Sequence, residues 1–414
     1  MSKFKTKEAF FIALGGQAPF VSFFIFGGYV NSLLGSSSAL ATFIAGLLIF
    51  VNGLVTNELS KRFPYYGGYY AYSYFTLSSS LSFTTFWTFL LFNVTYALAY
   101  LYGTAYMLTT YLFHNDLIAF IFSLAAIMIL YSSGRKPTAT YAIIAGSLEL
   151  AIMVFLGLYL LYLSSFNFLN PFEIKGDLSR GILFAAGIPT GYIVLSSIAE
   201  EVEDSRKVIG KMMLIVIVIG TLLSAFDLYA LSALNVAVID ALLLGLGIFV
   251  FPIVLFTAVN DGFLGVMAYL VSTTGLLKSL RYGFGDFLKG KAGFFSFFIY
   301  LIIPILLFYM VGNNFALFEA CGYLSLLANF FLNAMAAAAL LRIGISRLIR
   351  KRAWIYQLTI SIFSLISNVI IVILNIQSGE PLLVYFFMGW LIIGFVISSI
   401  IEVVREIQEE AKKQ

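Results

Sequence analysis

One apolar segment of this chain is broken in its middle, and that break limits the possible folds more than any other feature. The segment from Leu183 reads L-F-A-A-G-I-P-T-G-Y-I-V-L-S-S-I-A. Proline lacks an N–H and clashes with the preceding helical turn, and glycine loses most freedom in a helix, so Gly187, Pro189 and Gly191 interrupt the helix. Lipid cannot satisfy backbone groups freed at membrane depth. These groups must therefore line a protein cavity or bind a ligand.

The composition is typical of membrane proteins. Of the 414 residues, 61% are hydrophobic and 11% are charged, against roughly 45–50% and 25% in soluble domains. The N-terminal lysines precede a long apolar run without a small-residue cleavage site, which predicts a retained first span. The single cysteine, Cys321, allows no internal disulfide, and the single histidine, His114, lacks the partners of a catalytic or metal site. We expect no cofactor, no metal site and no nucleic-acid partner.

The hydropathy pattern predicts twelve membrane spans of about 20 residues each. Their limits are Phe10–Val30, Ala39–Asn57, Phe83–Leu112, Leu117–Ser132, Thr138–Ser164, Arg180–Ala199, Met212–Leu234, Gly247–Thr274, Gly293–Val311, Phe315–Leu341, Trp354–Ile376 and Leu382–Val403. All Lys and Arg residues except Lys175 and Arg180 fall in the terminal segments or in alternate loops. This asymmetry predicts a multi-pass protein of the cell membrane, in contact with lipid, with both termini in the cytoplasm.

The first span is interrupted like the sixth, by the run A-L-G-G-Q-A-P from Ala13 to Pro19. Two Gly/Pro-interrupted spans at corresponding positions are the best sequence sign of a secondary-transporter site, although Gly and Pro are common in membrane helices in general. Five spans separate the two repeat starts, so the second repeat enters from the opposite face. We expect residues 1–165 and 178–343 to form the two inverted repeats, 353–403 the last two spans, and 404–414 a charged cytoplasmic tail.

Two loops carry a family resemblance. The run E-L-S-K-R-F-P-Y-Y-G-G-Y-Y-A-Y from Glu58 to Tyr72 resembles a signature of the amino acid–polyamine–organocation (APC) transporters. The run E-E-V-E-D-S-R-K-V-I from Glu200 to Ile209 resembles the loop that follows their sixth span, and Gly191-Tyr192 resembles their broken sixth helix. The resemblance covers spans one to ten. It implies an all-α integral membrane protein with a LeuT-type five-plus-five inverted repeat, which moves amino acids or related amines.

The chain also departs from the family pattern. Ser205 and Gly210 stand where the family loop has prolines, and Ile193 stands where the broken sixth helix usually has a glutamate. Gln17-Ala18-Pro19 replaces the glycine-serine-glycine turn of many relatives, although one branch carries Ala-Pro there. The substrate preference of any one relative therefore does not transfer to this chain.

The first break suggests how an amino acid would bind. The N-terminus of a half-helix offers free N–H groups and a positive dipole end, which suits a carboxylate. We expect the substrate carboxylate near the start of the second half of span one. The expected donors to this carboxylate are the N–H groups of Gly16, Gln17 and Ala18. Gly15 and Gly16 have no Cβ, so they let the ligand come close to the backbone. Pro19 contributes no donor.

The sixth span is expected to hold the substrate's ammonium group. Its freed carbonyls belong to Phe184, Ala185 and Ile188, beside Gly187, Pro189 and Gly191. Asn93 and Tyr96 in span three are the polar candidates for side-chain specificity; the alternative is that both make hydrogen bonds between helices. Because no acidic side chain is assigned to the substrate pocket, a neutral amino acid is favoured over a cationic one.

Ionisable groups inside spans are costly and indicate function by default. The chain has three: Glu149 in span five, Asp227 in span seven and Asp261 in span eight. The resemblance implies that Glu149 and the Asn260-Asp261 pair face each other across a cation site beside span one, near the carbonyls of Ala13 and Gly16. Each acid could instead be permanently protonated and hydrogen-bonded to a neighbouring helix.

Two buried carboxyl groups at such a short distance from each other cannot both be charged unless a cation binds between them. The pair could bind sodium or carry the proton in symport. We favour the proton, because span eight has no Ser/Thr pair for sodium. The expected function is a secondary active transporter that moves a neutral amino acid by proton symport and alternating access. A sodium symporter and an amino acid/amine exchanger are alternatives.

Two other classes of membrane protein are less favoured. A membrane-embedded enzyme needs a nucleophile–base set or a metal cluster, and neither H-E-x-x-H nor G-x-S-x-G occurs in the chain. A sensor that keeps a transporter fold would normally carry an additional soluble signalling domain, whereas only a short charged segment follows Val403. We therefore expect a transporter and not an enzyme.

Overall fold

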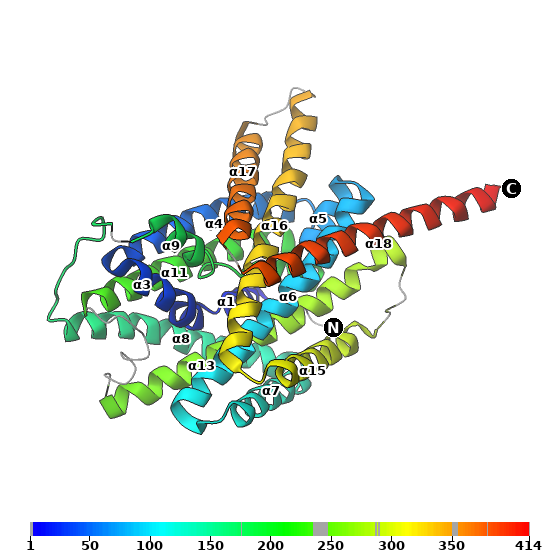
Figure 1. The fold of residues 1–414 in the computed structure, drawn as a ribbon. Helices are drawn as coiled ribbons and strands as arrows, with labels where there is room; N and C mark the ends of the chain where they lie inside the picture. Colours follow the sequence, from blue (N-terminus) through cyan, green and yellow to red (C-terminus); the bar gives the residue numbers. More distant parts are fainter. Residues whose placement is uncertain are drawn as a thin grey trace.

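The computed structural model describes residues 3–174, 176–234, 247–285, 288, 290–349, 355–378 and 380–413. Within this part of the chain the regular structure is helical (Figure 1). The helices of the first half are α1 (Thr6–Gln17), α2 (Pro19–Ser22), η1 (Phe23–Gly27), α3 (Gly28–Leu34), η2 (Gly35–Ser37), α4 (Ser38–Ser60), α5 (Tyr69–Thr76), α6 (Ser79–Leu108), η3 (Thr109–Phe113), α7 (Asp116–Ser132) and α8 (Arg135–Leu163).

The described elements of the second half are helices as well. Its helices are α9 (Leu178–Ala185), α10 (Val194–Ser197), η4 (Ala199–Glu201), α11 (Ser205–Ala233), α13 (Gly247–Ser279), α14 (Arg281–Phe284), α15 (Ala292–Val311), α16 (Asn314–Ile349), α17 (Ile355–Ser378) and α18 (Pro381–Lys413). Nine helices of the described chain are long and apolar enough to cross a membrane, and α7 is a shorter apolar helix. With the two broken spans, α1 to α3 and α9 to α10, the predicted order of spans is reproduced.

The predicted limits differ from the helices mainly at the ends. Several helices extend beyond the apolar core of their span, because the backbone hydrogen bonds of a helix continue into the polar flanks. Thus α11 begins at Ser205 rather than Met212, and α16 continues to Ile349 rather than Leu341. The last helix continues to Lys413, so the predicted tail is a helical extension. Trp354, the predicted start of the eleventh span, lies outside the described residues.

Three long helices form the centre of the bundle. In α6, α13 and α16, 78% of the most apolar stretch is buried inside the protein, against 22% in α15 and α18. The peripheral helices expose large apolar side chains such as Tyr309, Met310 and Leu382. Exposed apolar side chains on long helices are suited to contact with lipid, so the fold is that of a multi-pass membrane protein with a protein-lined interior.

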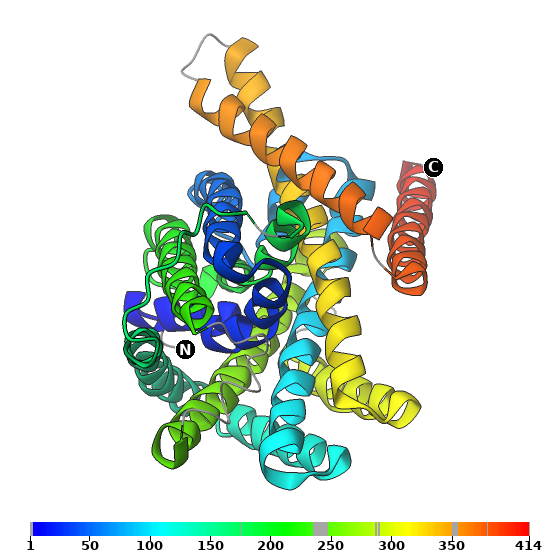
Figure 2. The same cartoon turned by 60° about the vertical axis from the view of Figure 1, so that its left-hand side comes forward.

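The last two helices lie on the outside of the bundle (Figure 2). Helix α17 packs on α16 and α4, and α18 packs on α6 and α16. Within the described chain, neither helix is among the main neighbours of the broken segments α1, α2, α9 and α10. The interior therefore belongs to the first ten spans, as the resemblance implied.

Candidate functional site

The first break falls between α1 and α2. Ala18 has a left-handed backbone, with φ of 43°, and its N–H donates to the carbonyl of Leu14 at 2.8 Å, which ends α1. Pro19 then begins α2, where its fixed φ is favourable and its missing N–H costs no hydrogen bond. The predicted interruption is thus a change of direction at one residue, Ala18.

The second break is longer. Helix α9 ends at Ala185 and α10 begins at Val194, and the chain between them forms turns. The N–H groups of Gly187 and Ile188 donate to the carbonyls of Phe184 and Ala185, both at 3.0 Å. These two carbonyls, which we expected to be free for an ammonium group, are therefore occupied by the turn in this conformation.

The two breaks touch through their glycines. Gly191 has a φ of 104°, and a Cβ on this residue would lie 2.0 Å from the carbonyl oxygen of Gly16. A Cβ on Gly16 would lie 2.8 Å from the carbonyl oxygen of Gly191. Only glycine fits at either position, because real Cβ contacts are longer and the φ of Gly191 suits no other residue. The structure is therefore closed at this crossing, without room for a substrate between these two residues.

Two carboxyl groups hold the N-terminus of α2. The N–H of Phe20 donates to Glu149 Oε1 at 3.2 Å, and the N–H of Val21 donates to Asp261 Oδ2 at 2.8 Å. Both acids are 1% exposed, and each has a second oxygen, Oε2 or Oδ1, without a partner in the described chain. The structure therefore brings together the two acids from α8 and α13 that the sequence singled out, and their shared contact is span one.

This contact corrects the predicted set of N–H donors. Gly16 and Gln17 lie in the last turn of α1, and the N–H of Ala18 is bonded within that helix. The donors at the start of α2 belong instead to Phe20 and Val21. The prediction failed because α1 continues to Gln17 before Pro19 starts the next helix, which moves the free N–H groups past the proline.

The predicted cation site also included Asn260 and Ala13, and the side chain of Asn260 does not bond to the Glu149–Asp261 pair. Asn260 accepts a hydrogen bond from Tyr141 at 2.7 Å and donates to the carbonyl of Phe256 at 2.7 Å, so its side chain is directed toward α8 and its own helix. Ala13 is a fully buried residue within α1, four residues before the helix ends. Asn260 is therefore adjacent to Asp261 in sequence but engaged elsewhere.

A layer of tyrosines covers both breaks. Tyr96 donates to the carbonyl of Gly187 at 2.8 Å, which is a hydrogen bond between span three and the sixth span. Tyr100 and Tyr269 donate to the carbonyls of Gln17 and Gly16 at 2.6 and 3.0 Å, and neither was predicted from the sequence. The three rings pack together with centroids 5.1 to 6.1 Å apart. The four-residue spacing of Tyr96 and Tyr100 on one helix face was the available signal.

Asn93 joins two helices rather than a break. Its Oδ1 accepts from Ser272 at 3.0 Å, and Ser197 donates to Ser272 at 2.9 Å. Its Nδ2 has no partner in the described chain. Asn93 thus makes a hydrogen bond between helices, and its contact with a substrate stays a prediction.

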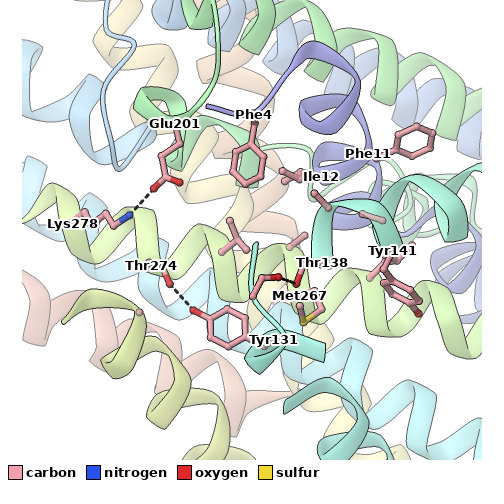
Figure 3. A pocket seen from close by; sticks show the side chains of 17 residues that line it. Phe4, Phe11, Ile12, Tyr131, Thr138, Tyr141, Glu201, Met267, Thr274 and Lys278 are labelled. Atoms are coloured by element: carbon pink, nitrogen blue, oxygen red, sulfur yellow. Dashed lines mark hydrogen bonds and ion pairs between the residues drawn. The ribbon is translucent and has the colours of Figure 1, made fainter. Parts of the chain in front are cut away.

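A cavity of about 390 Å³ lies between α1, α8 and α13 (Figure 3). This volume is that of a small-molecule pocket. Its walls are largely apolar, with Phe11, Leu264 and Met267 among them, and the Glu201–Lys278 ion pair at 2.6 Å lies at its edge. Leu264 also contacts Gly15, because a Cβ on Gly15 would lie 3.4 Å from that of Leu264. The cavity thus approaches the first break from the end of the bundle at which α1 begins.

Charged and aromatic side chains cluster at that end, which we call the basic end; the cluster contains Tyr66, Glu200, Glu201, Lys278, Arg281 and Tyr282. Arg281 contacts both oxygens of Glu200 at 2.6 Å, and Tyr282 donates to Glu200 at 2.5 Å. Tyr66 donates to Glu201 at 2.9 Å. Burial and the Glu201 carboxylate raise the pKa of Tyr66, so its hydroxyl remains a proton donor at neutral pH.

The same cluster explains the two loop motifs. Gly67 donates its N–H to the carbonyl of Ser197 at 2.9 Å, and a Cβ on Gly68 would overlap the hydroxyl of Ser196, at 2.1 Å. The chain before α1 also pairs with the second motif, since Phe4 donates to the carbonyl of Glu201 at 2.7 Å. The two motifs that carry the resemblance are therefore in contact, and together they close the basic end.

Comparisons with known proteins show the fold. The structure superimposes on a crystal structure of a manganese transporter from Eremococcus coleocola in complex with an aromatic bis-isothiourea substituted compound. The TM-score is 0.59 at 14% sequence identity, over 97% of this chain and 94% of that one. The likeness shows that the two chains share one fold. No family model and no curated protein matches the sequence.

The likeness confirms the predicted fold class, an all-α integral membrane protein of LeuT type with broken first and sixth spans. At this level of identity it supports the transporter architecture but not the APC family as such. The limits of the two repeats, the substrate and the coupling ion remain predictions from the sequence.

Proposed function

We propose that this protein is a secondary transporter that moves a small neutral amino acid by alternating access, driven by a proton. One observation carries the proposal: Glu149 and Asp261 bond the N–H groups that begin the second half of span one. These are the groups that a substrate carboxylate would use. Protein carboxyl groups and substrate carboxylate therefore compete for one set of donors.

This competition gives a physical route to coupling. Two carboxyl groups bonded to successive N–H groups are neighbours, and like charges in surroundings of low dielectric repel strongly. A proton on the pair weakens its hold on the N–H groups of Phe20 and Val21, because a neutral carboxyl group is a poorer acceptor than a carboxylate. Protonation would then release the donors for the substrate, and deprotonation on the other side of the membrane would expel it.

The surroundings of the breaks support an uncharged side chain on the substrate. The described residues from Ala13 to Ser22 and from Ala185 to Val194 include no Asp, Glu, Lys, Arg or His. The nearby side chains are aromatic or small, including Phe20, Tyr96 and Tyr269. A cationic side chain would find only the Glu149–Asp261 pair as its counter-charge, and the proton mechanism already uses that pair.

The first test is uptake of a mixed pool of labelled amino acids into proteoliposomes, with an inward proton gradient compared with an inward sodium gradient. We expect proton-driven accumulation, and a fall of about tenfold or more in the variant Glu149→Gln, a typical size for one coupling interaction. The matched control is Glu319→Gln, which changes an exposed carboxyl group on α16 outside the site. Intact proton-driven uptake in Glu149→Gln would contradict the proton role.

The other outcomes assign the alternatives. Accumulation with sodium alone would make the pair a sodium site, and exchange without accumulation under either gradient would indicate an exchanger. Labelled Mn²⁺ belongs in the same assay as a second candidate cargo, because the unpartnered oxygens of Glu149 and Asp261 suit a hard cation. Among the described residues, however, no three His, Cys, Asp or Glu side chains gather at one point.

A further inference from the structure

Helix α11 carries a buried acid that the proposed transport mechanism does not use. Asp227 is 0% exposed, and neither of its carboxyl oxygens has a hydrogen-bond partner of normal geometry in the described chain, although the backbone N–H of Gly157 lies close to it. A buried carboxyl group without partners is expensive, so it indicates a function or a bound species.

Asp227 belongs to a stripe of positions on one face of α11. Gly220, Ser224 and Asp227 are four and then three residues apart, which places them on the same side of the helix. The hydroxyl of Ser224 is also buried and has no partner among the described residues. The stripe extends over about 10 Å along the helix axis, from the rise of 1.5 Å per residue.

One end of the stripe faces the first break. A Cβ on Gly220 would lie 2.4 and 2.5 Å from the two amide atoms of Gln17, so the side chain of Gln17 lies flat against α11 at this glycine. Both amide atoms are buried and unpartnered in the described chain. Gln17 is three residues before Phe20, whose N–H donates to Glu149. The stripe therefore ends beside the carboxyl pair.

The other end of the stripe faces α8 and continues toward the end of the bundle opposite the basic end. A Cβ on Gly157 would lie 2.6 Å from Asp227 Oδ1, so a glycine makes room for the acid on α8. Farther along α11, Ser232 is bonded to Asn31 at 2.8 Å and lies 3.2 Å from Ser38. Polar groups therefore occur at this end of α11 as well as beside the first break.

Few other ionisable groups face Asp227. Among the elements packed against α11, α2, η1, η2 and α10 carry none, and the groups on α1, α4 and η4 and in the first two turns of α11 itself lie at the basic end; the side chains in the first turn of α8 are outside the described ones. Those remaining are Glu149, Tyr141, Tyr159 and Tyr162 on α8, Tyr29 on α3, and Tyr229 on α11 itself, which donates to the carbonyl of Leu169. Within the described chain, no basic side chain is available to pair with Asp227 at its depth.

We propose that Asp227, Ser224 and Gln17 form a proton relay that connects the end of the bundle opposite the basic end with the Glu149–Asp261 pair. The unpartnered groups are those that bind internal water, and a carboxyl group in the middle of such a row can accept a proton and pass it on. The relay rests on the proposed proton coupling. It adds the path by which the proton reaches the pair while the basic end is closed.

The test separates the relay from the transport function. Substrate counterflow, in which labelled substrate exchanges against unlabelled substrate at equal pH, needs the substrate site but no net proton movement. We expect Asp227→Asn to retain counterflow within about twofold and to lose about tenfold of proton-driven accumulation. Thr221→Ala is the matched control, because Thr221 faces Gly46 of α4 from the neighbouring side of the same helix.

Each result decides one point. Wild-type protein without proton-driven accumulation would refute the proposed coupling, whatever the variants do. Normal accumulation in Asp227→Asn, or loss of counterflow in a variant with a wild-type Tm, would overturn the relay. If Asp227→Asn does not fold, the variant Asp227→Glu is measured instead. Proton-driven accumulation retained in Asp227→Glu would support the relay, and its loss in folded Asp227→Glu protein would refute the relay. Infrared difference spectra between two pH values provide an independent readout, since the relay requires a carboxyl band that disappears in Asp227→Asn.

Discussion

Single residues set the geometry of both breaks. Pro19 has no N–H, so it starts α2 without a lost hydrogen bond and passes the donor role to Phe20 and Val21. Gly16 and Gly191 let two backbones meet where any Cβ would overlap a carbonyl oxygen. At this scale, the missing N–H of Pro19 and the missing Cβ atoms of the two glycines matter as much as the N–H groups that Phe20 and Val21 supply.

The crossing of the glycines gives a prediction at this scale. In Gly191→Ala the new Cβ would overlap the carbonyl of Gly16 and the backbone would be held at an unfavourable φ, which alone costs roughly 1–3 kcal/mol. We expect a clear fall in the Tm of the detergent-solubilised protein and loss of transport. Gly389→Ala on α18 is the control, because a Cβ there meets no atom within 4 Å. Equal Tm values for the two variants would refute the contact.

Whole helices are held by a few polar and aromatic contacts, because apolar surface does not drive helices together within lipid. Helix α18 shows this best. Trp87 of α6 and Trp390 of α18 stack with ring centroids 4.3 Å apart and planes 11° apart. Each indole N–H donates to the backbone carbonyl of the other tryptophan at 3.1 Å. These contacts attach α18 to the central helix, together with hydrogen bonds from Ser80 to Glu402 and from Ser398 to the carbonyl of Ser79.

We expect Trp390→Ala to loosen α18 without affecting transport, since α18 does not reach the breaks. The lost stacking and hydrogen bonds amount to about 2 kcal/mol. Hydrogen exchange should then increase along α18 but remain unchanged in α13. Tyr385→Ala, a truncation of a side chain 73% exposed on the same helix, is the control and should change neither. Unchanged exchange in α18 of Trp390→Ala would show that other contacts hold it.

The molecule as a whole is closed at the basic end. Glu200 and Glu201, at the start of the loop after the sixth span, bond residues of α13 and α14 and Tyr66 of the first motif loop. The cavity between α1, α8 and α13 lies directly behind this cluster. The proposed function requires such contacts to form and break, because alternating access closes one end while the other is open.

We therefore expect Arg281→Ala to shift the molecule toward conformations open at the basic end. Partly exposed ion pairs are individually weak, so the change should be moderate, about fivefold in the accessibility of the cavity. The measurement is the rate at which a maleimide labels Thr138→Cys in a Cys321→Ser background. Lys61→Ala, which removes an exposed ion pair with Glu58 within one helix end, is the control. An equal labelling rate in both variants would contradict a gating role for the cluster.

Much of the fold could be predicted from the sequence because lipid imposes strict rules. A span must be long and apolar, and a break must be marked by Gly or Pro, so Gly16, Pro19, Pro189 and Gly191 indicate both interruptions by residue type alone. The acids Glu149, Asp227 and Asp261 are equally visible, since charge inside a span is rare. The order of the spans and the positions of these groups along the chain are local properties.

Only the tertiary structure decided which of these groups meet. It placed Glu149 and Asp261 on the N–H groups of Phe20 and Val21, directed Asn260 away from them, and put Tyr100 and Tyr269 over the first break. It also aligned Asp227 with Gln17 along one face of α11. Such contacts depend on how each helix is rotated and how deeply it packs, and a uniformly apolar span of sequence contains little information about either.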